Sequence, residues 1–175
     1  MEVCRREGAA VLLAGSIARL GSHYAVGIEA IACRSGDSIN RELLEVDEKE
    51  QVLTALGTAA ARLRRKLGES RASLRQYDVP IVQATTPSLE ALRALSLGDL
   101  SRDHARLGDA LTFYRRATDL DPHFALAWAR RGAAARNLRQ SVADERFGAA
   151  EEPAIAFRKA YELRDRVSEP ERFYI

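Results

Sequence analysis

The chain has 175 residues, of which 46% are hydrophobic and 30% are charged, and its formal net charge is only +2. That length suits one good-sized domain or two small ones with a proper core. The balanced charge argues against nucleic-acid binding, because the basic face of such a protein usually dominates its charge. No apolar stretch approaches the ~20 residues of a membrane-spanning helix. The N-terminus mixes acids with bases and no long apolar core follows, so no signal peptide is expected.

The first third of the chain predicts a small α/β unit at residues 1–68. A helix is expected at Glu2–Glu7, followed by strands at Ala10–Ile17, Tyr24–Cys33 and Ser38–Val46. Apolar side chains alternate along the second strand, which is typical of a sheet with one buried face. A tight turn around Leu20–His23 would join the first two strands as a hairpin. The unit should therefore hold a three-stranded antiparallel sheet.

The two cysteines, Cys4 and Cys33, both lie in this unit. They form no CxxC motif and have no nearby histidine pair, so a zinc site of the usual kind is excluded. In the expected hairpin, Cys33 lies opposite Ala9 or Ala10, close to the end of the first helix. The thiols could then meet within the ~4.4–6.8 Å Cα separation of a disulfide. Two interpretations remain open here, a disulfide and a pair of buried thiols.

A longer helix should close the unit. Asp47 is expected as its N-cap, with Glu50 three residues later completing a reciprocal capping arrangement, and Gly68 as its end. Apolar residues recur at helical spacing along it. Four basic residues fill its last turns: Arg62, Arg64, Arg65 and Lys66. They either form a binding patch or complement the negative end of the helix dipole.

Residues 69–86 predict a linker. The stretch is mostly polar at first, and Pro80 argues against a helix around it. Thr86 has the side chain of a good N-cap, and Pro87 would then occupy the first helical position, where its missing N–H costs nothing.

The rest of the chain repeats itself. Residues 114–120 (YRRATDL) match residues 157–163 (FRKAYEL) type for type. A second echo has a spacing of 34 positions, with one substitution of Trp for Ala. Its members are Leu92, Ala94, Gly98 and Arg102, which recur as Leu126, Trp128, Gly132 and Arg136. Such internal similarity predicts a stack of similar helical units.

These spacings resemble those of the tetratricopeptide repeat (TPR) family, whose units pair a helix A with a helix B. The resemblance implies an α-helical solenoid at residues 87–175, with units at 91–124 and 125–167 and a third begun at 168. Ala94 and Ser101 stand where the family usually has bulky residues. The second unit carries a nine-residue insertion within Gln140–Pro153. The structural signature positions are Gly98, Ala110, Tyr114, Ala117, Pro122, Trp128, Gly132, Phe157 and Ala160.

The first 68 residues are similar to a small α/β domain related to the amino-terminal domain of TolB. The similarity rests on the pattern Gly-Ala-x-x-x-Leu-x-Gly-Ser-Ile at 8–17 and on Cys-Arg-Ser-Gly-Asp at 33–37. This domain followed by TPR units resembles the C-terminal region of bacterial signalling proteins, including serine/threonine kinases and winged-helix regulators. The resemblance implies an α+β chain whose parent protein has its catalytic or DNA-binding domain upstream. The parent is expected to be tethered to a membrane, and this chain to lie on either its cytoplasmic or its extracytoplasmic side.

A search for reactive groups finds no catalytic constellation. His23, His104 and His123 are scattered and lack ligand spacing. The adjacent acids Glu151 and Glu152 would diverge on a helix, which is poor geometry for paired carboxylate catalysis. No nucleophile has a plausible base and no phosphate loop is present. We therefore expect no enzyme, no metal site and no cofactor in this chain.

In TPR arrays the A helices line a concave groove that binds peptides or helices. The resemblance places eight residues of this chain inward: Leu92, Leu95, Asp99, Arg102, Leu126, Ala129, Ala133 and Arg136. A mostly apolar groove with one arginine per unit suits an amphipathic helix or an extended peptide with an acidic group. The Lys and Asn set that clamps a C-terminal carboxylate in some members is missing, so binding of chaperone tails is not expected. Alternatively, these residues pack against the next repeat of a longer solenoid.

Two hypotheses for function follow. In the first, the chain is a non-catalytic interaction and sensor segment of a signalling protein and docks a protein or peptide partner. In the second, it is a structural scaffold whose repeats serve self-association without reading a ligand. A third and weaker hypothesis is that the α/β unit binds a small ligand.

Overall fold

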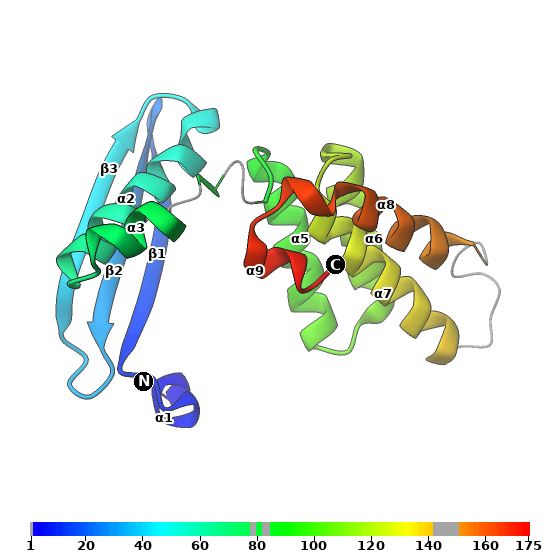
Figure 1. The fold of residues 1–175 in the computed structure, drawn as a ribbon, viewed down its shortest axis with the longest axis horizontal. Helices are drawn as coiled ribbons and strands as arrows, with labels where there is room; N and C mark the ends of the chain where they lie inside the picture. The colour runs from blue at the N-terminus through cyan, green and yellow to red at the C-terminus, as the bar shows by residue number, and fades with distance from the viewer. Residues whose placement is uncertain (1, 78–79, 82–84, 142–150) are drawn as a thin grey trace. The chain divides into compact units, whose positions relative to one another are not determined.

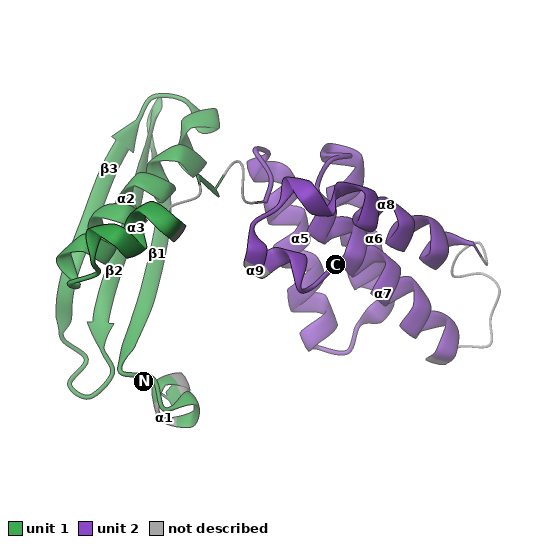
Figure 2. Ribbon diagram, in the orientation of Figure 1, with its two compact units in different colours: residues 1–81 green, residues 82–175 purple. Residues whose placement is uncertain are grey.

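The computed structural model describes residues 2–77, 80–81, 85–141 and 151–175. It is an α+β protein that divides into two compact units, Met1–Ile81 and Val82–Ile175 (Figure 2). A three-stranded sheet and its helices form the first unit, and helices alone form the second among the described residues. None of the described helices is both long enough and apolar enough to span a membrane.

The first unit is built around an antiparallel sheet with strand order β1-β2-β3. Helix α1 (Glu2–Glu7) precedes β1 (Val11–Leu20), β2 (His23–Ala32) and β3 (Ser38–Val46), as Figure 1 shows. The first two strands pair from Val11 with Ala32 to Leu20 with His23, so only Gly21 and Ser22 form the hairpin turn. Gly21 has a φ of 64°, which glycine adopts without strain. The predicted order of strands is confirmed.

Helix α2 (Val52–Lys66) packs against β2 and β3. The predicted capping arrangement is wrong, because the helix is preceded by a 3-10 turn at Lys49–Gln51 and no side chain caps either element. The side chain of Asp47 instead pairs with His23, with its Oδ1 2.7 Å from His23 Nδ1. The 3-10 turn takes up the residues that a capping box would have needed, so α2 begins several residues later than expected.

The core of the first unit lies between α2 and the inner face of β2. Val26 and Ala30 of β2 are fully buried, as are Val52 and Leu53 of the helix. The residues of β1 that share this face are far more exposed: Leu13 keeps 56% of its surface accessible. The helix layer therefore shields β2 and leaves β1 open.

The segment predicted as a linker contains a helix. Helix α3 (Arg71–Tyr77) buries Leu74 and packs against α2, and Ile81 contacts α2 at Gly57. Arg64 and Glu69 pair at 2.5 Å across the junction between the two helices, which holds the pKa of Glu69 well below its usual range, at about 2. The first unit thus extends to Ile81, and the prediction of a polar linker from residue 69 is wrong. The apolar residues of α3 form too short a run to give a helical pattern, since Ala72, Leu74 and Tyr77 are separated by two and three positions only.

Cys4 and Cys33 are joined by a disulfide with a Cα separation of 5.6 Å. The pairing of the backbone brings the two cysteines together, because the N–H of Cys33 donates to the carbonyl of Ala10 at 3.0 Å, close to the end of α1. Of the two interpretations open at the level of sequence, the structure contains the disulfide. It ties α1 to the end of β2.

Two helical hairpins make up most of the second unit. Helices α5 (Leu89–Asp103) and α6 (Leu107–Leu120) form the first, and α7 (Ala125–Ser141) and α8 (Glu152–Leu163) form the second. Helix α6 also packs on α7, so the hairpins stack. A 3-10 turn at Arg164–Arg166 and the short helix α9 (Glu169–Arg172) follow. The insertion falls mostly outside the described residues, and Pro153 lies in the first turn of α8, where proline is tolerated.

The N-cap of α5 is Ser88, whose hydroxyl accepts from the N–H of Ala91 at 3.1 Å, so the prediction of Thr86 is wrong. Thr86 is completely buried instead. Its hydroxyl accepts from the N–H of Ser88 and donates to Asp121 at 2.6 Å. The start of α5 is thereby tied to the end of α6. Both residues have side chains suited to capping, and only the fold decides between them.

Candidate interaction site

The two hairpins interlock by the same device. In the first, Gly98 of α5 faces the ring of Tyr114 on α6, and a methyl group at Gly98 would lie 2.5 Å from that ring. In the second, Gly132 of α7 faces Phe157 on α8, where the corresponding distance is 2.9 Å. Only glycine leaves room for the aromatic ring at these positions. The glycine pair with the 34-residue spacing thus has equivalent roles in the two hairpins.

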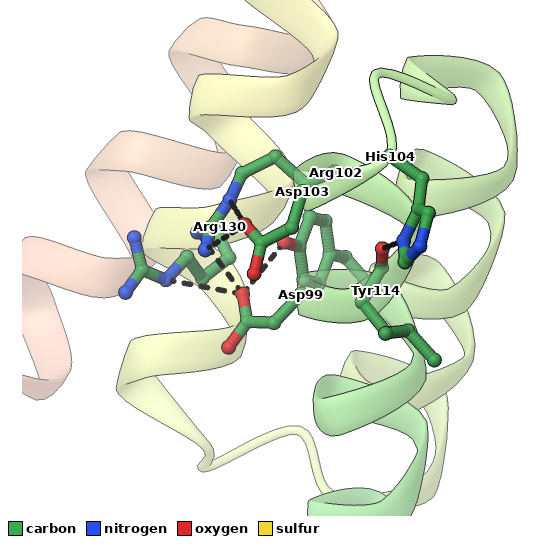
Figure 3. Close-up of polar contacts among 7 residues, drawn as sticks. Asp99, Arg102, Asp103, His104, Tyr114 and Arg130 are labelled. Atoms are coloured by element: carbon green, nitrogen blue, oxygen red, sulfur yellow. Dashed lines mark hydrogen bonds and ion pairs between the residues drawn. The ribbon is translucent and has the colours of Figure 1, made fainter. Parts of the chain in front are cut away.

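Asp99 is the centre of a polar cluster between α5, α6 and α7 (Figure 3). The hydroxyl of Tyr114 donates to Asp99 Oδ1 at 2.8 Å, and Arg102 approaches the same oxygen at 3.1 Å. Arg130 reaches toward it from α7, with its Nε at 3.6 Å. Two arginines and one buried phenol therefore converge on one carboxylate oxygen.

Burial raises the pKa of Tyr114, and its hydrogen bond to Asp99 adds to the shift. The phenol therefore stays protonated and acts as a donor. For Arg102, the hydrogen bonds to Asp103 are the main cause of a raised pKa, with Asp99 contributing. The charges of the cluster cancel, since two carboxylates face two guanidinium groups.

A second ionic cluster joins the two hairpins. Glu152, at the start of α8, is only 8% exposed. It accepts two hydrogen bonds from Arg115 on α6, one of them 2.8 Å long, and one of 2.9 Å from Arg131 on α7. The guanidinium of Arg115 lowers the pKa of Glu152, and Arg131 lowers it further. Thr118 accepts from Arg131 at 3.1 Å, so this cluster spans three helices.

The predicted groove residues divide into a buried and an accessible set. Leu95 and Ala129 are buried at 4% and 5% exposure, so they belong to the interior and cannot contact a partner, contrary to their predicted role. Leu92 and Leu126 are partly buried against the same core. The accessible part consists of Asp99, Arg102, Ala133 and Arg136, of which the arginine on α7 is the most exposed.

The two predicted arginines differ in their surroundings. Arg102 is occupied by Asp99 and Asp103. Arg136 is exposed, and its guanidinium lies 5.7 Å from the centre of the Phe157 ring, a cation–π arrangement. The prediction of equivalent arginines at matching height therefore needs correction, because one is neutralised by neighbouring carboxylates and the other is held against an aromatic face.

The C-terminal residues lie against the same helices. Tyr174 places its ring 5.8 Å from the guanidinium of Arg130, and Ile175 packs beside Trp128. Thr85 donates to Glu171 of α9 at 2.8 Å, which joins the end of the chain to the residues before α5. Burial raises the pKa of Glu171. The segment after residue 168 thus contacts α7 and the residues that precede α5.

Within the described part of the chain, no group of three or more His, Cys, Asp or Glu side chains is arranged to hold a metal ion. Of the three histidines, His104 contacts the carbonyl of Leu100 at 2.7 Å and His123 faces Arg166 at 3.3 Å. The first contact is local to the end of α5, whereas the second joins the turn between α6 and α7 to the 3-10 turn that follows α8. On the first unit, Arg62, Arg65 and Lys66 line a shallow hollow with Glu42, and Lys66 pairs with that buried glutamate at 2.7 Å.

Sequence reasoning missed Arg130, Arg131 and Glu152. The first two lie in α7 outside the repeated pattern, and Glu152 appeared only as one of two adjacent acids. An arginine pair on one helix turn gives no signal of where its partners lie. Their roles depend on the stacking of α7 between α6 and α8.

Comparison with known proteins adds no assignment: no family model, no curated protein and no solved structure matches this chain.

Proposed function

We propose that this chain is a non-catalytic interaction segment of a larger bacterial signalling protein, and that its second unit is a pair of TPR units that docks a partner peptide or helix. The observation that carries the proposal is the repeated interlock of Gly98 with Tyr114 and of Gly132 with Phe157. Helical repeats of this kind present side chains of successive helices along one extended face. The sensor role of the α/β unit rests on its resemblance to TolB-related domains.

The accessible charges favour one part of the face for binding. The guanidinium of Arg136 lies over the Phe157 ring, and no carboxylate of the described residues pairs with it, whereas Arg102 is already paired with Asp103. Leu92 and Leu126 add partly exposed apolar surface. A peptide with an acidic group near an apolar side chain would match this arrangement.

Selection from a displayed peptide library, followed by calorimetry with the full chain, tests the proposal. We expect selected peptides to carry acidic residues and to bind with micromolar affinity. The variant Arg136→Glu should weaken binding at least tenfold, because it reverses the charge that meets the acid. Arg116→Glu is the matched control, since Arg116 is also an exposed arginine and lies on α6.

Two results would contradict the proposal. One is the absence of any selected peptide that binds in solution. The other is equal binding by wild type, Arg136→Glu and Arg116→Glu, which would place the contact elsewhere.

The alternative is a scaffold whose repeats self-associate. Phe173 and Tyr174 favour it, because they expose 84% and 67% of their surfaces at the end of the helical unit. Light scattering of wild type and Phe173→Glu distinguishes the two. A dimer lost in this variant supports the scaffold, and a dimer retained by it argues against association through the repeats.

A further inference from the structure

The outer edge of β1 is unusually unprotected. Along its ten residues, Arg19 is the only charged side chain, and Val11, Leu13 and Ile17 are 38%, 56% and 49% exposed. The opposite edge strand, β3, carries the charges Arg41, Glu42 and Glu45. Charged side chains are a common means of keeping sheet edges from pairing with other strands. The two edges therefore differ in their ability to accept a further strand.

The backbone of β1 shows which groups point outward. Cys33 donates to Ala10 at 3.0 Å, whereas the N–H of the neighbouring Ala32 donates to Asp37 on the β3 side at 2.9 Å. In an antiparallel pair these directions alternate along each strand. With Ala10 bonded toward β2, the N–H and C=O groups that face the free edge belong to every second residue after it. These residues are Val11, Leu13, Gly15, Ile17 and Arg19.

The same five residues share one face of the sheet with the buried core. Leu13 lies opposite Ala30 and Ile17 lies opposite Val26, and both partners on β2 are fully buried. The apolar surface of the core thus continues onto β1 and stops at its edge. A strand added there would extend both the hydrogen-bonded ladder and the apolar face.

We propose that this edge pairs with β1 of a second copy of the chain, in antiparallel register about a two-fold axis at Gly15. In that register Leu13 of each copy lies opposite Ile17 of the other, and Gly15 lies opposite Gly15. All five outward-facing residues then find partners, whereas registers centred on Leu13 or Ile17 leave two of them beyond the partner strand. An interface that repeats the same contacts twice is the usual form of a two-fold dimer.

Charge also favours a second copy. The two Arg19 side chains lie at opposite ends of the paired strands, about 27 Å apart at ~3.4 Å per residue, so they do not repel each other at close range. The stretch from Leu13 to Ile17 contains no charge at all. The resulting six-stranded sheet would form through one strand per copy, which is a small interface and fits a weak dimer. This inference is independent of docking by the helical unit.

Sedimentation equilibrium of the full chain, from low micromolar to near-millimolar concentration, tests the proposal. We expect a concentration-dependent dimer. Leu13→Lys should raise the dissociation constant at least tenfold, because it places a charge in the apolar contact. Leu43→Lys is the control, since Leu43 is also 56% exposed but lies on β3, and it should leave the dimer unchanged. A monomer at all concentrations, or equal effects of both variants, would overturn the proposal.

Cross-linking tests the register directly. Two residues in a hydrogen-bonded antiparallel pair have Cα atoms ~5.5 Å apart, within the range of a disulfide. Gly15→Cys should therefore form a covalent dimer on mild oxidation, whereas Ile17→Cys should not, because the two copies of residue 17 lie about 14 Å apart in this register. Cross-linking of Ile17→Cys alone, or of neither variant, would overturn the register. Phe173→Glu should leave this dimer intact. That result would distinguish pairing through β1 from self-association through the helical repeats.

Discussion

In the first unit a single helix covers β2 and β3 and leaves β1 exposed, whereas in the second unit α5 to α8 pack on one another in succession. The first unit is tied by a disulfide and the second by glycine–aromatic interlocks and a buried ionic cluster. A sheet with one helix buries only part of its surface, so we expect the disulfide to contribute much of the stability of the first unit. Stacked helices can bury both sides of each element, and their stability then depends on close fit.

Removal of the disulfide should produce the largest difference in stability between the two units. Replacing Cys4 and Cys33 with serine opens a loop with a sequence separation of 29 residues. The chain-entropy model gives a loss of about 3.5 kcal/mol in the free energy of unfolding for such a loop. Trp128, the only tryptophan, reports on the second unit, while far-ultraviolet circular dichroism reports on both. We expect the dichroism to show an earlier transition and the fluorescence transition to stay in place; coincident shifts would mean that the units unfold together.

Loss of the carboxylate at Glu152 should affect the second unit alone. Glu152→Gln removes the negative charge that Arg115 and Arg131 share and replaces one acceptor oxygen with an NH2 donor. We expect a cost of roughly 2 kcal/mol, a moderate value because both arginines keep some contact with solvent. Urea unfolding followed by Trp128 fluorescence measures the loss. Arg116→Gln, on the exposed side of α6, is the control and should change stability little.

The same residue predicts a pH dependence. The pKa of Glu152 is lower in the folded state than in the unfolded state. The stability that its ionised carboxylate provides is therefore complete above the unfolded-state pKa and is lost as pH falls through the folded-state pKa. Wild type should therefore lose stability at acid pH more steeply than Glu152→Gln. Parallel curves for the two proteins would show that the cluster does not control this acid transition.

Two glycine-to-alanine substitutions, one in each unit, should change the free energy of unfolding in opposite directions. Gly98→Ala puts a methyl group 2.5 Å from the buried ring of Tyr114, and we expect a net loss of roughly 1–2 kcal/mol after the gain in helix propensity. Gly57→Ala in α2 meets Ile81 at an ordinary 3.8 Å, so it should stabilise the first unit by up to ~1 kcal/mol. Thermal unfolding of both variants provides the comparison, and a stabilising Gly98→Ala would contradict the interlock.

The smallest expected effect concerns the C-terminal segment. The pKa of Glu171 is raised by burial, so its charged form opposes the folded state as pH rises above the unfolded pKa. Glu171→Gln keeps an acceptor for Thr85 and should stabilise α9 at neutral pH by less than ~1 kcal/mol. Amide exchange near the C-terminus should slow in this variant at pH 7 and differ less from wild type at pH 4.

Several parts of the fold followed from local pattern. The hairpin of β1 and β2 was predictable because alternation and a glycine turn specify register, and the meeting of Cys4 with Cys33 depended on that register. The helical hairpins followed from the 34-residue spacing. Helix α3 was not predictable, because a single buried side chain, Leu74, among residues 71–76 gives no periodicity. The choice of Ser88 over Thr86 as N-cap was also open, since both hydroxyls can cap a helix.

The candidate site was predicted less well than the fold. Leu95 and Ala129 share helix faces with accessible residues, so spacing alone could not tell the interior from the groove. Arg102 is an exception, because its partners Asp99 and Asp103 lie on its own helix at i−3 and i+1, so helical spacing alone could have predicted its pairing with Asp99. The roles of Arg131 and Glu152 depend on three helices meeting, which no local pattern records.

By itself, the sequence determined where strands and most helices form, which residues recur at equivalent places, and which glycines admit an aromatic ring. These properties arise from neighbours along the chain or from a repeated spacing. Only the tertiary structure decided which charges of different helices neutralise one another, which strand edge stays open, and which side chains of the repeats remain accessible. Those properties arise from residues brought together by packing, where the environment of a side chain depends on elements distant in sequence.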